Sequence, residues 1–157
     1  NEPADLAELL RGASAFGAGG LLVDVDDTTF IPPGDMPARI AAAVTASGRK
    51  PPVSRVATVR CVLDSLAAGY ARTLDQATAL TDRAPNVVHV VGGGAQNHLL
   101  CRLTAAAVGL PLVAGPTEAT ALGNVLVQAR AIGALTGSLS DLRAVAAAST
   151  RLMRYEP

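Results

Sequence analysis

The chain has 157 residues, which is enough for one domain with a sizeable core. Its 13 basic residues balance its 13 acidic residues, which argues against a nucleic-acid-binding surface and against an acidic tail for a cationic partner. Half of the chain is hydrophobic but no Trp is present, so the core has to be built from Ala, Val and Leu. No apolar run reaches membrane-spanning length, and the first residues lack the basic start and apolar block of a signal peptide.

The N-terminal half is predicted to be helical apart from one strand. We expect a flexible lead-in over residues 1–20 that includes a short helix over residues 4–11. Residues 21–25 predict a strand, and an acidic turn follows it. Asp35 is placed to cap a helix that ends near Gly48.

The longest helical pattern begins after Ser54 and extends to about Thr81. Apolar residues recur in it every three or four positions, which predicts one buried stripe that belongs to the core. Gly69 lies within this helix, where it would allow a neighbour to pack closely. The stripe consists of Val56, Val59, Leu63, Leu66, Tyr70, Leu74, Ala77 and Leu80.

The C-terminal half predicts two strands and three helices. A valine-rich strand over residues 86–91 leads through three glycines into a helix over residues 97–108, and a short strand follows at residues 112–114. We expect Thr117 to cap the next helix, which ends by Gly133. Ser138 or Ser140 is expected to cap the last helix, which ends near Thr150. The tail over residues 151–157 is expected to be irregular. This order favours an α/β fold, a small parallel sheet covered by helices, within a single domain over residues 1–157.

The glycine turn is the strongest indication of a ligand. A buried strand, a glycine-rich turn and a helix present backbone N–H groups to a phosphate. Gly92, Gly93 and Gly94 also allow a ligand to approach the backbone without meeting a Cβ. We therefore expect phosphate or nucleotide binding here, although such glycines also serve close packing.

Two other interpretations of the sequence are weaker. Asp24-x-Asp26-x-Thr28 after an apolar strand resembles the motif of haloacid-dehalogenase-type phosphatases, but the lysine and acidic pair which that chemistry needs downstream are not found in order. Gly92-x-Gly94-x-x-Asn97 is a near-match to a dinucleotide fingerprint, with Asn at the third position. A solvated acidic turn is the simpler interpretation of the first motif.

No metal site is predicted, and the cysteines are expected to be inert. His89 and His98 each stand alone among apolar residues, which favours neutral imidazoles without a metal. Cys61 and Cys101 are isolated within helical patterns, which indicates reduced thiols of a cytoplasmic protein. Because the first residue is Asn and not Met, we expect the chain to be a piece of a longer protein.

Three blocks of residues resemble the FGGY carbohydrate kinases, which share the actin-like ATPase fold. GGGAQNHLL (92–100) resembles their nucleotide-binding turn, and AGPTEATALGNVLVQ (114–128) resembles the second block of the same domain. Together with FIPPGDMPARI (30–40), these sequence motifs most resemble those of the family branch that phosphorylates L-rhamnulose. The resemblance runs from about residue 20 to the tail and implies the C-terminal, nucleotide-binding subdomain of a two-domain kinase.

The resemblance implies ATP contacts from the glycine turn, at Gly92, Gly93 and Gly94, with Gly93 as our first choice. Gln96 and Asn97 match the polar pair that follows, and Asn97 is placed either to cap the helix or to reach the adenosine. Glu118 matches an acidic residue of the second block. We expect it either to have a structural role or to contact residues that bind the ligand, without binding the ligand itself. Gly123 and Asn124 of that block are expected to be packing residues.

The resemblance also implies what the chain lacks. In these kinases the aspartate that acts as general base, most of the sugar pocket and the turns that hold the β- and γ-phosphates and Mg²⁺ lie upstream of the matching region. None of the acidic residues in the turn at residues 24–27 matches that base, so we expect no catalytic residue here. The implied partners are ATP, a ketose and an N-terminal domain; a non-catalytic module that keeps the fold for packing alone is the alternative.

Overall fold

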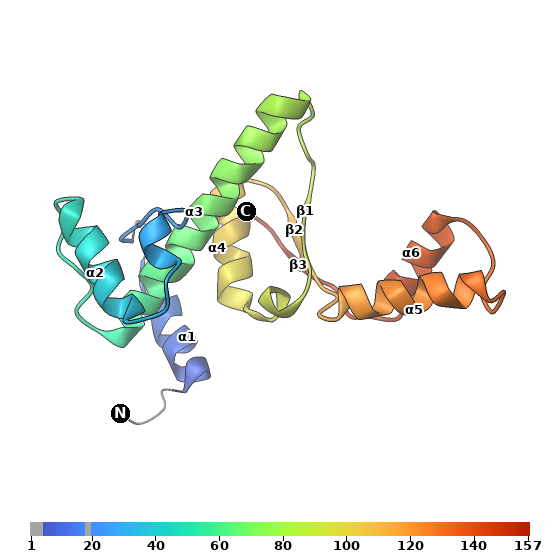
Figure 1. The fold of residues 1–157 in the computed structure, drawn as a ribbon, viewed down its shortest axis with the longest axis horizontal. Helices are drawn as coiled ribbons and strands as arrows, with labels where there is room; N and C mark the ends of the chain where they lie inside the picture. The colour runs from blue at the N-terminus through green and yellow to red at the C-terminus, as the bar shows by residue number, and fades with distance from the viewer. Residues whose placement is uncertain (1–4, 18–19) are drawn as a thin grey trace. The chain divides into compact units, whose positions relative to one another are not determined.

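Helices dominate this computed structural model, which describes residues 5–17 and 20–157 (Figure 1). Two compact units are formed, one ending at Arg83 and the other beginning at Ala84. No helix in the described part of the chain is long and apolar enough to cross a membrane. The elements are, in order, α1 (Leu6–Ser14), the 3₁₀ helix η1 (Thr28–Phe30), α2 (Met36–Ala46), α3 (Arg55–Thr81), β1 (Val88–Val90), the 3₁₀ helix η2 (Gly93–Gln96), α4 (His98–Val108), β2 (Leu112–Ala114), α5 (Ala119–Ala131), α6 (Leu139–Ala148) and β3 (Met153–Tyr155).

Side-chain caps fix the starts of the helices in the first unit. Ser54 Oγ accepts from the Ala57 N–H at 3.1 Å, and Asp35 Oδ1 accepts from the Ala38 N–H at 3.1 Å. Each bond satisfies a backbone donor that a helix N-terminus leaves unpaired. Both predicted caps, and the extent of α3 to Thr81, are confirmed.

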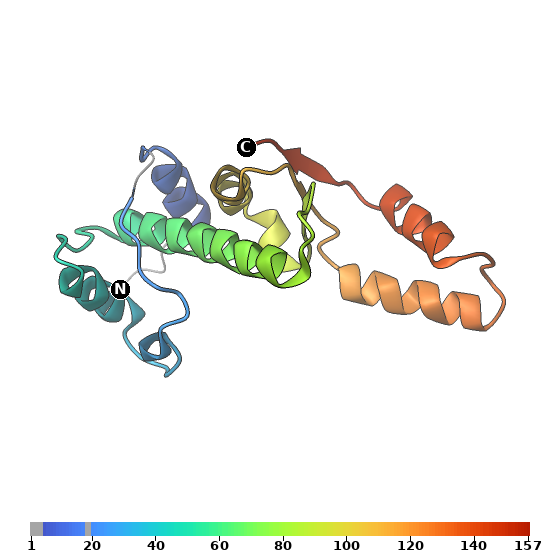
Figure 2. The ribbon, with the colours of Figure 1, turned by 90° about the horizontal axis from the view of Figure 1, so that it is seen from above.

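The first unit is built around α3, the long green helix of Figure 2, against which α1 packs. Gly12 of α1 lies so close to α3 that a Cβ there would be 2.9 Å from Val56 Cγ1. The short helix expected over residues 4–11 is present as α1, from Leu6 to Ser14; residues 1–4 and 18–19 lie outside the described residues. A cluster on the other side of α3 joins it to α2 and contains Ile40, Val44 and Cys61.

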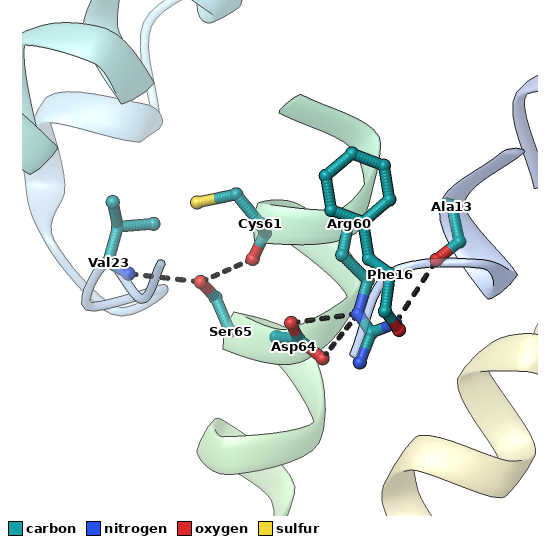
Figure 3. A network of polar contacts seen from close by, with 7 residues as sticks. All are labelled: Ala13, Phe16, Val23, Arg60, Cys61, Asp64 and Ser65. Atoms are coloured by element: carbon teal, nitrogen blue, oxygen red, sulfur yellow. Dashed lines mark hydrogen bonds and ion pairs between the residues drawn. The ribbon is translucent and has the colours of Figure 1, made fainter. Parts of the chain in front are cut away.

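The strand predicted over residues 21–25 does not form. This segment is irregular, and the Val23 N–H donates to Ser65 Oγ of α3 at 3.0 Å (Figure 3). Ser65 in turn donates to the Cys61 carbonyl at 2.7 Å. The apolar run is therefore explained by packing against a helix, since Val23 packs against the cluster with α2.

The stripe predicted along α3 is only partly correct. Leu63 is buried, but Tyr70 and Leu80 are 46% and 87% exposed. The reason is that α3 has neighbours on two sides in its first half, so burial there extends around the helix and does not follow one line. The buried residues of α3 are Arg60, Cys61, Leu63, Ser65, Ala67 and Gly69.

The second unit contains a three-stranded sheet in the order β1-β2-β3. β1 and β2 are parallel, with Val90 opposite Ala114, whereas β3 is antiparallel to β2, with Met153 opposite Ala114. The predicted all-parallel sheet is therefore wrong, and so is the irregular tail, because β3 lies within it. A buried cluster joins β2 to α4 and η2 and consists of Ala95, Cys101, Ala105, Leu112 and Ala114.

The helices α5 and α6 pack against each other (Figure 2). Ser138 caps α6 as one of the two predicted candidates, and it forms a capping box with Asp141. The predicted Thr117 cap of α5 is wrong, because the N-cap position is occupied by Glu118, which makes no side-chain bond there. The fold is thus α/β and helix-rich with a small sheet, as predicted.

Candidate functional site

The glycine turn lies at the carboxyl end of β1. Gly92 has a φ of 81°, a conformation that favours glycine, and η2 follows it directly. Two backbone bonds join this turn to the segment after β2: Gly115 N–H donates to Val90 O at 2.8 Å, and Gly92 N–H donates to Pro116 O at 3.1 Å. The carboxyl ends of two parallel strands therefore meet here, where ligands bind in many α/β folds.

The backbone of the turn is open on its outer side. Gly93 and Gly94 are exposed, and a Cβ at either position would meet no atom of the described structure within 4 Å. Neither of these two glycines has a positive φ. Since neither packing nor conformation within the described residues requires glycine at positions 93 and 94, bare backbone is left accessible to a ligand.

Asn97 is the N-cap of α4. Its Oδ1 accepts from the Leu100 N–H at 3.0 Å, and the side chain is half-buried. The bond fixes the point where the turn becomes a helix. The predicted cap role is confirmed, and Asn97 remains a candidate ligand contact through its amide nitrogen.

Cys101 supports the turn from the protein interior. Its Sγ lies 3.8 Å from the Ala95 carbonyl oxygen and 4.0 Å from that of Gly94, the distances of weak S–H···O bonds. The side chain is 1% exposed, and burial raises the pKa of its thiol. A protonated Cys101 is therefore a packing and hydrogen-bonding residue, as predicted for both cysteines.

A pocket of about 340 Å³ adjoins the turn. Three segments form it: the end of η2 with the start of α4, the residues after β2, and the residues at the start of β3. Its size is at the lower end of the range that small-molecule sites occupy, about 300–1,000 Å³. The lining residues are Ala95, Gln96, His98, Ala114, Gly115, Thr117, Arg151 and Met153.

Of the site residues predicted from the sequence, Gln96 lines this pocket, whereas Gly92, Gly93, Gly94 and Asn97 lie near lining residues in the chain without lining it themselves. Glu118 does not line it either. Gly123 is exposed, and a Cβ there would meet no atom of the described residues within 4 Å, so the close packing expected of it is not made within them. Arg151 and Met153 also line the pocket, and neither was predicted from the sequence. The tail carries no strand signal, so nothing in the sequence places these residues near the glycines.

The acidic turn is held by structural contacts. Arg72 donates to Asp24 Oδ1 at 3.0 Å and also to Asp26. Asp27 caps η1 by accepting from the Thr29 N–H at 2.8 Å, and this bond lowers the pKa of its carboxyl group. Within residues 5–17 and 20–157, no group of three or more His, Cys, Asp or Glu side chains is placed to hold a metal ion.

Comparison with known proteins identifies the family. Residues 1–132 match the C-terminal domain of the FGGY family of carbohydrate kinases. Rhamnulokinase of Bacteroides thetaiotaomicron is 39% identical over 150 residues, which are 96% of this chain and 31% of that protein. Rhamnulokinase of Klebsiella pneumoniae is 38% identical over 153 residues, which are 98% of this chain and 31% of that protein. The chain thus spans 31% of the length of these curated relatives.

The match covers the glycine turn, both parallel strands and all of α5, and the α/β arrangement is consistent with an actin-like ATPase fold. The chain therefore belongs to the FGGY family of carbohydrate kinases, whose C-terminal domain it contains.

Proposed function

We propose that this chain is the ATP-contacting part of a sugar kinase that phosphorylates L-rhamnulose at its primary 1-hydroxyl. Membership of the carbohydrate kinase family supports the reaction type. The similarity to two rhamnulokinases supports the choice of sugar. A cytoplasmic location belongs to the same proposal, because the two buried cysteines are free thiols.

The observation that carries the proposal is the bare backbone at Gly93 and Gly94. Their open outer side, next to a pocket of about 340 Å³, leaves room for a nucleotide to lie against main-chain atoms. Side chains there would occupy the space that the nucleotide needs. In this proposal the nucleotide contacts come from Gly92, Gly93, Gly94, Gln96 and Asn97, with Gly93 as the central one.

Catalysis of phosphoryl transfer depends mostly on positioning and electrostatic stabilisation, so the task of this chain is to hold the nucleotide in one place. ATP supplies the phosphoryl group. Gly92 turns the chain away from β1, Asn97 fixes the start of α4, and Cys101 supports the turn from inside. These contacts keep the turn rigid, so that binding does not have to order it.

The remaining parts of the reaction are assigned to regions outside this chain. We propose that the general base and most of the sugar pocket lie in an N-terminal domain that closes over the nucleotide. The described residues hold no ligand cluster that fits Mg²⁺, so no role in holding the metal is assigned to them. The chain by itself should have no kinase activity and should bind ATP weakly. Turnover of L-rhamnulose by this chain alone would contradict the proposal.

The test is Gly93→Val in the complete enzyme. The β-branched side chain would occupy the space above the turn, so KM for ATP should rise far more than KM for the sugar. Gly17→Val is the matched control, because Gly17 is also exposed, has no positive φ, and a Cβ there would meet no atom of the described residues within 4 Å. It should leave both constants unchanged. Equal increases in both Michaelis constants for Gly93→Val would overturn the assignment of the site.

A further inference from the structure

Arg151 is brought to the glycine turn by the antiparallel pairing of β3. Because Met153 lies opposite Ala114, the residues just before β3 lie at the same edge of the sheet as the residues that follow β1 and β2. The Arg151 backbone packs against Gly115, where a Cβ would be 3.3 Å from the Arg151 carbonyl oxygen. Gly115 has a φ of 110° and is buried, so this close approach is part of the local fold.

A second contact holds β3 in this position. The Tyr155 hydroxyl is hydrogen-bonded to His98 Nδ1 at the start of α4, and Tyr155 packs against the core of the unit. The two rings lie with their centroids 6.2 Å apart. β3 is therefore fixed both to the sheet and to the helix that follows the glycine turn, which limits the positions open to Arg151.

Arg151 is exposed, and among the described residues that line this pocket it is the only Arg, Lys, Asp or Glu. Within the described part of the chain its guanidinium has no hydrogen-bond or ion-pair partner. Arg154, three residues later, differs in this respect, because it pairs with Glu156 at 2.6 Å. An unpaired guanidinium in a pocket offers an anionic ligand up to five N–H donors in a fixed planar fork.

We propose that Arg151 binds the phosphate chain of the nucleotide that lies on the glycine turn. This inference rests on the proposed function, since it takes the ligand of the turn to be ATP. The negative charge of ATP is carried by its phosphates, and guanidinium groups bind phosphate oxygens in bidentate fashion. Arg151 lies beyond residues 1–132, which match the family's C-terminal domain, so the assignment adds a binding residue from the tail.

The experiment compares ATP, ADP and adenosine as ligands of the complete enzyme, by titration calorimetry. Arg151→Gln should weaken the binding of ATP and ADP by roughly tenfold or more, since hydrogen bonds to charged groups are the strong ones. Adenosine, which has no phosphate, should bind as before. Arg151→Lys should recover part of the loss, because it restores the charge without the planar fork.

Arg143→Gln is the matched control. Arg143 lies on α6 and does not line the pocket, so this variant makes the same change of charge without touching it. It should leave the affinities for all three ligands unchanged. Circular dichroism of each variant checks that the fold is retained.

The outcomes separate the two proposals. If Arg151→Gln leaves ATP affinity unchanged, or weakens ATP and adenosine equally, the assignment of Arg151 is wrong. In that case a Gly93→Val variant that still loses ATP affinity would leave the proposed function standing. If the wild-type enzyme binds neither ATP nor adenosine, the proposed function fails, and the role of Arg151 fails with it.

Discussion

Arg60 and Asp64 form an ion pair in the interior of the first unit, in which one guanidinium nitrogen faces both carboxylate oxygens. Arg60 Nε lies 2.9 Å from both carboxylate oxygens of Asp64 (Figure 3). The two side chains are only 7% and 11% exposed. Arg60 Nη1 also donates to the carbonyl oxygens of Ala13 at 3.1 Å and of Phe16 at 2.6 Å. One guanidinium therefore joins α3 to the C-terminal end of α1.

The first prediction concerns this ion pair. Arg60→Met should lower the free energy of unfolding by about 3 kcal/mol, because it leaves the Asp64 carboxylate buried without its partner. Urea unfolding followed by circular dichroism measures the change. The double variant Arg60→Met/Asp64→Leu removes the buried charge as well, so it should be more stable than Arg60→Met. A double variant that is less stable than the single one would contradict this explanation.

The second prediction concerns the close approach of Val25 to α3. A Cβ at Gly69 would be 2.7 Å from Val25 Cγ2, and valine has little freedom to move aside. Gly69→Ala should therefore lower the free energy of unfolding by about 1 kcal/mol, because the overpacking cost exceeds the gain in helix propensity. The control is Gly123→Ala on the exposed face of α5, where a Cβ meets nothing within 4 Å. Gly123→Ala should raise the free energy of unfolding by up to about 1 kcal/mol. If Gly69→Ala also stabilised the protein, the segment that carries Val25 would have to move aside freely, which would contradict the prediction.

Features that depend on neighbours in sequence could be predicted from the sequence. The caps at Asp35, Ser54 and Ser138 are local, since each oxygen bonds a backbone N–H three residues away. The ends of β2 are predicted correctly because Gly115 and Pro116 stop the strand. The same holds for the length of α3, whose pattern extends over many turns.

Features that depend on distant partners could not be predicted. Residues 21–25 have the apolar content of a strand, and only their contacts with α3 determine that they stay irregular. β3 is a strand because β2 offers it an open edge, which no pattern within Met153–Tyr155 reveals. The burial of Arg60 likewise depends on carbonyl groups 44 and 47 positions away.

The same division applies to the candidate site. The turn at Gly92–Gly94 and the cap at Asn97 carry local signals, whereas the part of the pocket made by Arg151 reaches it only through strand pairing. The phosphatase and dinucleotide interpretations relied on short motifs without such a context. Membership of the FGGY family now explains the glycine turn, and the contacts of Arg72 explain the acidic turn, so these findings replace both interpretations.

The third prediction separates the two roles considered for Asn97. Asn97→Ala should lower the free energy of unfolding by about 1 kcal/mol, because the Leu100 N–H loses its acceptor. Asn97→Ser keeps an acceptor at the cap but removes the amide nitrogen that we propose contacts the nucleotide, so we expect it to retain the stability and to raise KM for ATP. Thermal unfolding and steady-state kinetics of the complete enzyme give the two quantities. A Ser variant with retained stability and an unchanged KM for ATP would show that Asn97 acts as a helix cap and does not contact the nucleotide.

The fourth prediction concerns the two cysteines. Cys61 and Cys101 are each 1% exposed, and burial raises the pKa of both thiols above the ordinary value of 9.0. The folded state thus keeps protons that the unfolded state releases above pH 9.0, so stability should fall as the pH rises beyond that value. The measurement is the free energy of unfolding against pH for the wild type and for Cys61→Ala/Cys101→Ala. The difference between the two curves should shrink at high pH; a constant difference would contradict the shifted pKa values.

Both thiols should also react slowly with a disulfide reagent until the protein unfolds, because the thiolate is the reactive form and both groups are shielded. The comparison is the rate of labelling in buffer and in urea. Fast labelling of the native protein would show that at least one cysteine opens to solvent.

The fifth prediction uses the capping box of α6. Ser138 donates to Asp141 Oδ2 from its backbone N–H at 2.6 Å and from its hydroxyl at 2.8 Å, and these bonds lower the pKa of the Asp141 carboxyl group below its ordinary value of 3.8. The carboxylate therefore stabilises the folded state above pH 3.8, and this contribution is lost as the pH falls through the lowered pKa. Asp141→Asn removes the titrating group, so its stability should depend less on pH in this acidic range than that of the wild type. Hydrogen exchange of the α6 amides measures the local effect, and identical acid dependence in the two proteins would contradict it.

Asp5, which caps α1 through the Ala7 N–H, provides the control: Asp5→Asn should leave the acid dependence of α6 unchanged, since the two helices belong to separate units.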